Sequence, residues 1–290
     1  MVILHVKKDD ESQFLYETKV SESIDAVTTD ITFIYNGRLK ISRICSEMEE
    51  LAKHGTFYPP EILGLLEEQV EELKLTDEWG EKCSPSGGWK LNKDPIGRRN
   101  GRQPVEEMQQ VLLNTVEEAK AMVSKKLVSA NKCLTIGAVQ EAIRLLGGAC
   151  SIVYPMGLPP HDPIREELEN KEQLEGTQAS REVMEVAVAR LWFSGRELSR
   201  EKLLRDYVGP NDKSKLIVKL ARLGQGAPAR EPVVTEEVKR RMMADAFRRQ
   251  EQLKKLEQDD DDVYLNSSWA DSGALKKSFH GLSNVSWKPK

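Results

Sequence analysis

The sequence has few of the residues on which enzyme active sites and metal centres usually depend. Four of its 290 residues are histidine and four are cysteine. The cysteines form no C-x-x-C pair at the spacing of a zinc site. The sequence also contains no nucleophile elbow, no zinc-protease motif, no P-loop and no dinucleotide-binding glycine motif. We therefore expect a protein that is not an enzyme, with no catalytic residue, no metal and no cofactor.

Aromatic residues and long apolar runs are scarce as well. Aromatic residues make up 6 % of the chain and charged residues 31 %. No stretch approaches the roughly 20 apolar residues of a membrane-spanning helix, and the apolar start is too short for a signal peptide. The 43 basic residues nearly balance the 47 acidic ones, for a net charge of −4, whereas nucleic-acid binding needs a basic surface. We predict a cytoplasmic protein with a small core, no membrane insertion and no nucleic-acid ligand.

Alternating apolar residues predict that the chain begins with two strands. Residues 2–7 alternate, and residues 14–20 alternate again after a polar turn. A helix that tolerates an internal glycine follows and ends at Gly55. A ubiquitin-like β-grasp fold begins with this order, and so does a generic α+β fold. We predict an α+β fold with an N-terminal ubiquitin-like, β-grasp-like sheet and helices.

The middle of the chain mixes irregular and helical patterns. Prolines and glycines punctuate residues 56–104, which predicts an irregular insertion with one short acidic helix. Helices are predicted over 104–127 and 136–146. The apolar run 149–154 then predicts a buried strand that joins the N-terminal sheet. These segments together define a predicted N-terminal domain over residues 1–175.

The last third is predicted to be helical and then extended. Residues 176–225 form a predicted helical region, with helices over 178–207 and 212–223. In 235–257, acidic residues precede basic ones by four positions, and each such pair stabilises an exposed helix by about 0.2–0.5 kcal/mol. Residues 226–290 are therefore predicted to be a charged helix followed by an extended, partly disordered arm.

Three segments offer chemistry for binding other proteins. Four prolines fall within the nine residues that follow residue 154, and they hold the backbone near extended conformations that lose little entropy on binding. Alternatively, this turn only crosses the surface with Met156 and Leu158 packed inward. Arg98 and Arg99 form a basic turn that would suit an acidic partner, or a solvated loop. Aromatic side chains in the polar tail expose apolar area unless they dock on this chain or on a partner. The partner-binding candidates are Tyr154, Pro155, Met156, Leu158, Pro159, Pro160, Asp162, Pro163, Arg98, Arg99, Trp269, Phe279 and Trp287.

Several unusual strings resemble one known family over essentially the whole chain. They are CSEMEELAKHG (45–55), DEWGEKC (77–83), DPIGRRNG (94–101), VYPMGLPPHDPIR (153–165), GQGAPAREP (224–232), and the terminal YLNSSWAD, FHG and WKPK. These strings resemble the Kurly family of cilia- and flagella-associated proteins. The resemblance implies a factor required for ciliary motility, linked to outer dynein arm assembly, basal bodies and planar cell polarity. It implies no active site.

Two functions from different classes follow. The favoured hypothesis is a non-enzymatic assembly or adaptor factor that binds proteins of the axonemal dynein preassembly machinery, and polarity-signalling proteins in addition. It would act in the cytoplasm, with the cilium and basal body as further locations. The alternative is a ubiquitin-like docking protein of the ubiquitin pathway. A hydrolase built on His161 and Asp162 is a third, weaker hypothesis.

Overall fold

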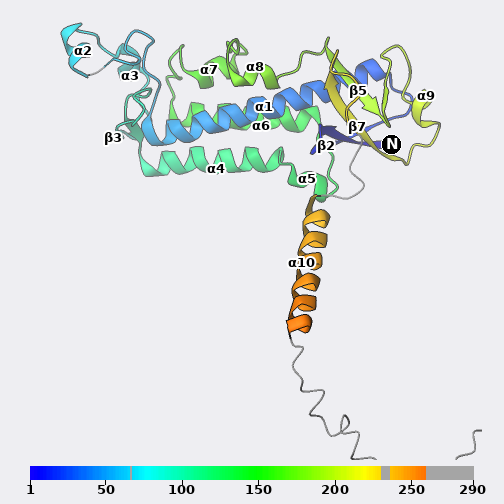
Figure 1. The fold of residues 1–290 in the computed structure, drawn as a ribbon. Helices are drawn as coiled ribbons and strands as arrows, with labels where there is room; N and C mark the ends of the chain where they lie inside the picture. Colours follow the sequence, from blue (N-terminus) through cyan, green and yellow to red (C-terminus); the bar gives the residue numbers. More distant parts are fainter. Residues whose placement is uncertain (66, 230–235, 259–290) are drawn as a thin grey trace, which may run out of the picture. The chain divides into compact units, whose positions relative to one another are not determined.

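A computed structural model describes residues 1–65, 67–229 and 236–258 (Figure 1). It divides the chain into two compact units, Met1–Arg230 and Glu231–Lys290. The larger unit combines a five-stranded sheet with helices. The predicted α+β class is confirmed.

The sheet of the larger unit has the strand order β2-β1-β7-β5-β6. Strand β1 is antiparallel to β2 and parallel to β7, and β5 is antiparallel to both β7 and β6. A hairpin, a helix and a later central strand parallel to the first are the arrangement of a ubiquitin-like β-grasp. The predicted β-grasp-like sheet is confirmed. Its strands are β1 Val2–Lys8, β2 Glu11–Thr18, β5 Ala189–Phe193, β6 Arg196–Glu197 and β7 Lys215–Arg222.

Helix α1 (Ile24–His54) joins the sheet to the rest of the unit. The Ser23 side chain caps its start by accepting a hydrogen bond from the Ala26 N–H at 3.2 Å. With 31 residues, α1 is about 46 Å long. Its first half lies over the sheet, and its second half extends beyond the sheet along α4 (Glu106–Met122) and α6 (Ile136–Val153) (Figure 1).

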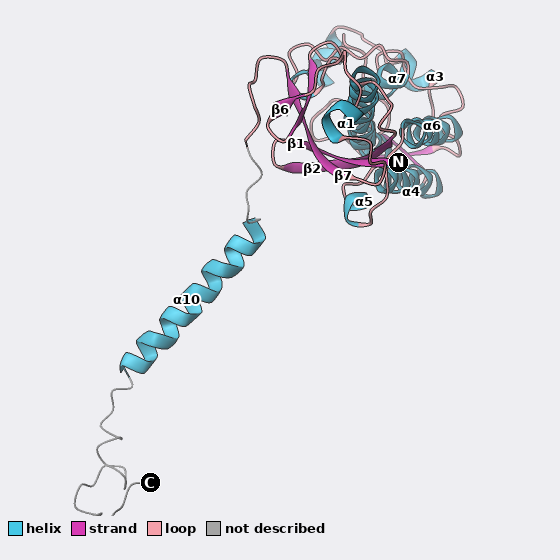
Figure 2. Cartoon of the chain, turned by 90° about the vertical axis from the view of Figure 1, so that its right-hand side faces the viewer, coloured by secondary structure: helices cyan, strands magenta, loops and turns pink. Residues whose placement is uncertain are grey.

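The second half of α1 forms a helical layer with α4 and α6. Figure 2 shows these three helices side by side and nearly end-on. Gly37 allows the close approach of α6, because a Cβ atom at this position would lie 2.4 Å from Val139 Cγ1. The glycine that the predicted helix was expected to tolerate is therefore a packing requirement. Buried residues of the layer include Ile41, Ile44, Met48, Leu51, Leu112, Val116, Ala142 and Leu146.

The remaining elements of the larger unit are short. The predicted irregular insertion, residues 56–104, contains a two-stranded sheet and two short helices, one of them within the predicted acidic helix. Helix α4 begins at Glu106, because Pro104 ends a strand. These elements are α2 Glu67–Glu72, α3 Glu78–Lys82, β3 Trp89–Leu91, β4 Arg102–Pro104, α5 Lys126–Ser129, α7 Pro163–Leu168, α8 Gln178–Glu182 and α9 Arg205–Val208.

The strand predicted over 149–154 is wrong, because α6 continues to Val153. Gly147 and Gly148 were expected to end the helix, but neither has the positive φ of a helix C-cap. Ala149, Cys150 and Val153 follow Leu146 at helical spacing and are buried in the same core. An apolar run of this length is compatible with a strand or with a buried helix, and tertiary packing decides between them.

The predicted helical region 176–225 is also wrong, because it supplies three strands of the sheet. Ser194 and Gly195 have φ values of 49° and 77° and form the tight turn between β5 and β6. The segment predicted as a helix over 212–223 contains a strand in the structure. Strand β7 lies between β1 and β5. Residues 218–221 are buried, and the apolar Ile217 on the outer face interrupts the alternation that identifies a strand.

Helix α6 has the length and composition of a membrane-spanning helix, alone among the helices in the part of the chain that the structure describes. Core helices have the same properties, and α6 buries one face in the helical layer against α1 and α4. In the smaller unit, α10 (Glu236–Gln258) confirms the helix predicted over 235–257. The predicted extended tail lies outside the described residues.

Candidate functional site

Two of the predicted binding segments meet at the C-terminal end of α1. Arg99 from the basic turn and Asp162 from the proline-rich turn form an ion pair, with 3.8 Å between Nη1 and Oδ2. The exposed fraction is 4 % for Arg99 and 0 % for Asp162. We call this buried pair, with its backbone partners, the clasp.

The Arg99 guanidinium connects the basic turn to α1. Nη1 donates a hydrogen bond to the Gly55 carbonyl oxygen at 2.9 Å. Nη2 donates to the Glu47 carboxylate at 2.6 Å and to the Glu47 carbonyl oxygen at 3.2 Å. The guanidinium carbon also lies 5.5 Å from the centroid of the Phe57 ring. Arg99 is thus a structural side chain, and the prediction of a solvated arginine is wrong at this position.

Asp162 fixes the proline-rich turn in the same way. Its Oδ1 accepts a hydrogen bond from the Ile164 N–H at 3.0 Å and so caps α7. Its Oδ2 accepts one from the Phe57 N–H at 3.3 Å. Burial raises the pKa of Asp162, while the Arg99 guanidinium and the two N–H groups oppose this rise.

A second aspartate shapes the basic turn and directs Arg99 inward. Asp94 accepts hydrogen bonds from the N–H groups of Ile96, Arg98 and Arg99 at 2.9, 2.8 and 3.0 Å. Burial acts to raise the pKa of Asp94, but the three N–H donors outweigh it and leave this pKa below its usual value. The predicted site lacked Asp94, although Asp-Pro-x-Gly is a turn signal that identifies it.

The clasp separates the predicted site residues into buried and exposed sets. Met156 is 78 % exposed and Ile96 70 %. The alternative in which Met156 packs inward is therefore wrong, while Leu158 is buried. The exposed candidates are Arg98, Pro155, Met156 and Pro160, the buried ones are Tyr154, Leu158, Pro159, Arg99 and Asp162, and Pro163 is half-buried. Trp269, Phe279 and Trp287 lie outside the described residues.

The remaining polar groups around the clasp are also held in the protein interior. The hydroxyl of Tyr154 is buried without a hydrogen-bond partner among the described residues, and burial raises its pKa. Burial also raises the pKa of the Cys150 thiol to about 12. His161 Nε2 lies 3.1 Å from the Phe57 carbonyl oxygen. A nucleophilic thiol needs a lowered pKa, so the environment of Cys150 does not favour the thiolate.

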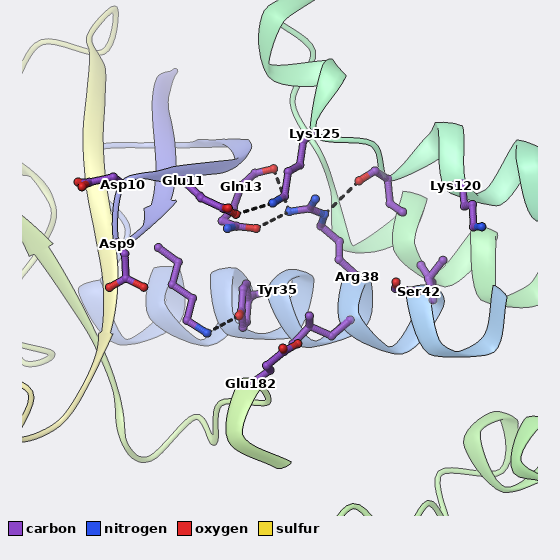
Figure 3. Close-up of a pocket in the computed structure, with 14 residues that line it drawn as sticks. Asp9, Asp10, Glu11, Gln13, Tyr35, Arg38, Ser42, Lys120, Lys125 and Glu182 are labelled. Carbon is purple, nitrogen blue, oxygen red and sulfur yellow. Dashed lines mark hydrogen bonds and ion pairs between the residues drawn. The ribbon is translucent and has the colours of Figure 1, made fainter. Parts of the chain in front are cut away.

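A hollow of about 790 Å³ lies between the β1–β2 hairpin, α1 and the segment that joins α4 to α5 (Figure 3). Arg38 projects into it from α1 and donates hydrogen bonds to the carbonyl oxygens of Val123 and Gln13 at 3.0 and 2.9 Å. At its edges, Lys8 donates to the Tyr35 hydroxyl at 2.6 Å. These bonds connect the sheet to the helical layer. Side chains of both charge signs line this hollow.

The described ranges contain no cluster of three or more His, Cys, Asp or Glu side chains that could hold a metal ion. Arg99 and Asp162 in the clasp and Arg38 in the hollow make internal contacts. Fold and site together define a β-grasp protein that is enlarged by a helical insertion and exposes two clasped loops.

Comparison with known proteins identifies the family. The family model for cilia- and flagella-associated protein 298 matches residues 189–285. The chain is 57 % identical to cilia- and flagella-associated protein 298 of Drosophila melanogaster over 288 residues, which cover 99 % of both chains. It is 57 % identical to the Homo sapiens protein and 58 % identical to the Mus musculus protein, in each case over all of both chains. The chain belongs to this family of cilia- and flagella-associated proteins, and the predicted resemblance is confirmed. No solved structure matches.

Proposed function

We propose that this protein is a non-enzymatic adaptor of motile cilia that acts in the assembly of outer dynein arms. It binds proteins of the axonemal dynein preassembly machinery in the cytoplasm. Membership of a cilia- and flagella-associated family supports the ciliary part of this proposal. The proposal has further parts. They are the role in outer dynein arms, the roles in planar cell polarity and basal-body positioning, and the binding of polarity-signalling proteins.

The clasp is the observation that carries the adaptor role. Arg99 and Asp162 are almost completely buried, and they fix two loops that expose the apolar side chains of Ile96 and Met156. Apolar side chains on a rigid loop lose little entropy when they bind, so such a surface suits a protein partner. The clasped polar groups are occupied by internal bonds, which supports a binding function over a catalytic one.

A rescue experiment tests this proposal in multiciliated cells that lack the protein. The null cells are expected to lose outer dynein arms, and the full chain to restore them. Met156→Glu should bind the preassembly proteins less well in pull-downs and should rescue poorly. Phe33→Glu, at a side chain that is 57 % exposed on α1, is the matched control. Normal arms in the null cells would contradict the dynein-arm role.

A truncation tests whether the C-terminal arm contributes. A chain that ends after residue 226 retains every strand of the sheet and lacks α10. We expect it to recover fewer partners than the full chain in the same pull-down. Unchanged recovery would show that the arm does not bind these partners. The proposal would then rest on the two loops that the clasp holds.

The order of the strands favours a second candidate, a ubiquitin-like docking protein. Ile217 on β7 pairs in register with His5 on β1, on the face of the sheet away from the core, and is 42 % exposed. An apolar residue at the centre of such a face could be bound by ubiquitin-receptor domains. Binding of the full chain to these domains, abolished by Ile217→Glu and retained in Met156→Glu, would support this candidate.

A further inference from the structure

Helix α10 exposes bulky apolar side chains. The exposed fraction is 60 % for Met242, 65 % for Met243, 63 % for Phe247 and 60 % for Leu253. Burial of such side chains contributes about 1.5–3 kcal/mol each, so a helix that leaves them in water is suited to binding.

These side chains lie on one half of the helix. At 100° per residue, Val238, Met242, Leu253, Met243 and Phe247 fall within an arc of 180°. Three cations share this half, and within 237–255 every carboxylate lies on the opposite half. The cations are Lys239, Arg249 and Lys254, and the carboxylates are Glu237, Asp245 and Glu251.

The spacing and charge of residues 238–249 narrow the choice of partner. Val238, Met242 and Phe247 place anchors at i, i+4 and i+9, so that they span about two and a half turns along the same half of the helix. The same twelve residues carry five cations and one carboxylate, a net charge of +4. A basic amphipathic helix with bulky anchors is the ligand of apolar grooves with acidic rims.

We infer that α10 docks in the methionine-lined groove of a Ca²⁺-loaded EF-hand sensor of the calmodulin class. Such sensors open an apolar groove when Ca²⁺ binds, and their many carboxylates complement the cations of α10. This inference rests on the proposed adaptor function, in which the C-terminal arm contacts partners. It adds that one of these contacts depends on Ca²⁺.

Two other occupants fit the helix less well. A second copy of α10 would bring Lys239, Arg249 and Lys254 of the two chains together, and within 237–255 no carboxylate lies on that half of the helix to offset them. An anionic membrane would attract the same cations. It would also repel the run Asp259–Asp262 that follows the helix in the sequence, because a bilayer presents a continuous negative surface.

Calorimetric titration of the full chain with calmodulin tests the inference. We expect binding in Ca²⁺ to be about a hundredfold tighter than in EGTA. Phe247→Glu should weaken binding by about thirtyfold, because it places a charge at a central anchor. Gln252→Glu adds the same charge on the opposite half of the exposed helix and should leave the affinity within about twofold.

Three results would overturn the inference. The first is no binding to calmodulin in Ca²⁺, or binding that Phe247→Glu and Gln252→Glu weaken equally. The second is a dimer of the full chain in sedimentation that Phe247→Glu dissociates. The third is Ca²⁺-independent binding to phosphatidylcholine–phosphatidylserine vesicles that Phe247→Glu abolishes. If calmodulin fails to bind while truncation after residue 226 still loses partners from ciliated cells, the inference fails and the adaptor function stands.

Discussion

Arg99 and Asp162 lie far apart in the sequence, yet they form an ion pair of 3.8 Å that is almost completely buried. The pair holds the basic turn and the proline-rich turn against the end of α1, where Glu47 and Gly55 provide further acceptors. A buried pair of this kind gives a site its geometry, because each partner is unfavourable without the other.

Removal of the cation should therefore destabilise the protein strongly. Arg99→Met leaves Asp162 buried without its counter-charge, and we expect the free energy of unfolding to fall by about 3–5 kcal/mol in urea titrations. Arg98→Met is the matched control, since Arg98 is exposed in the same turn, and its change should stay within about 0.5 kcal/mol. Equal effects of the two substitutions would show that the clasp does not hold the loops.

The pH dependence of stability should identify Asp162 as a carboxyl whose pKa is raised in the folded state. A raised pKa means that the folded protein binds a proton more tightly than the unfolded chain. Its contribution is then greatest below the ordinary pKa of 3.8 and is lost as the pH rises through the folded value. Asp162→Asn cannot titrate. We therefore compare the free energy of unfolding of the wild type with that of Asp162→Asn. The wild type should gain stability relative to the variant as the pH falls toward 3.8. A relative loss over this range would contradict a raised pKa for Asp162.

Packing of the helical layer predicts that a substitution at Gly37 destabilises the protein and that a second substitution at Val139 restores part of the stability. A methyl group at position 37 would lie 2.4 Å from Val139 Cγ1, so Gly37→Ala should destabilise the protein by about 1–3 kcal/mol through overpacking. The double variant Gly37→Ala, Val139→Ala removes the clash and should recover part of this loss. Thermal unfolding of the single and double variants measures the coupling.

A second glycine is the control for helix propensity. Gly148 lies in α6 with no atom within 4 Å of its would-be Cβ. Gly148→Ala should therefore stabilise the protein by about 0.5–1 kcal/mol, because alanine restricts the unfolded chain and favours the helix. If both substitutions destabilised the protein, the close α1–α6 contact would not be the cause of the stability loss in Gly37→Ala.

Local patterns predicted the elements whose signal is local. The first hairpin, α1 and α10 follow from alternation and helical spacing. The clasp could be predicted only as two separate segments, because no local rule pairs Arg99 with Asp162. Asp94 could have been found from its turn signal. Strands β5 and β7 could not be predicted from local patterns, because β7 is stabilised by pairing with β1, more than 200 residues away in the sequence. The apolar run 216–218 also interrupts the alternation that identifies a strand.

Gly195 distinguishes the strand from the helix that the local pattern predicted. Within a helix over 178–207, Gly195→Ala would stabilise the protein by about 1 kcal/mol. In the structure Gly195 has a φ of 77° in the β5–β6 turn, a region that L-residues with a side chain occupy at a loss of about 1–2 kcal/mol. Gly195→Ala should therefore lower the free energy of unfolding by that amount. Ser194→Asn should be tolerated, because Ser194 has a φ of 49° and asparagine adopts this conformation readily. Urea titrations measure the change in the free energy of unfolding for each variant. A fall for Gly195→Ala supports the β5–β6 turn. A rise for Gly195→Ala would instead support the predicted helix and contradict the assignment of β6.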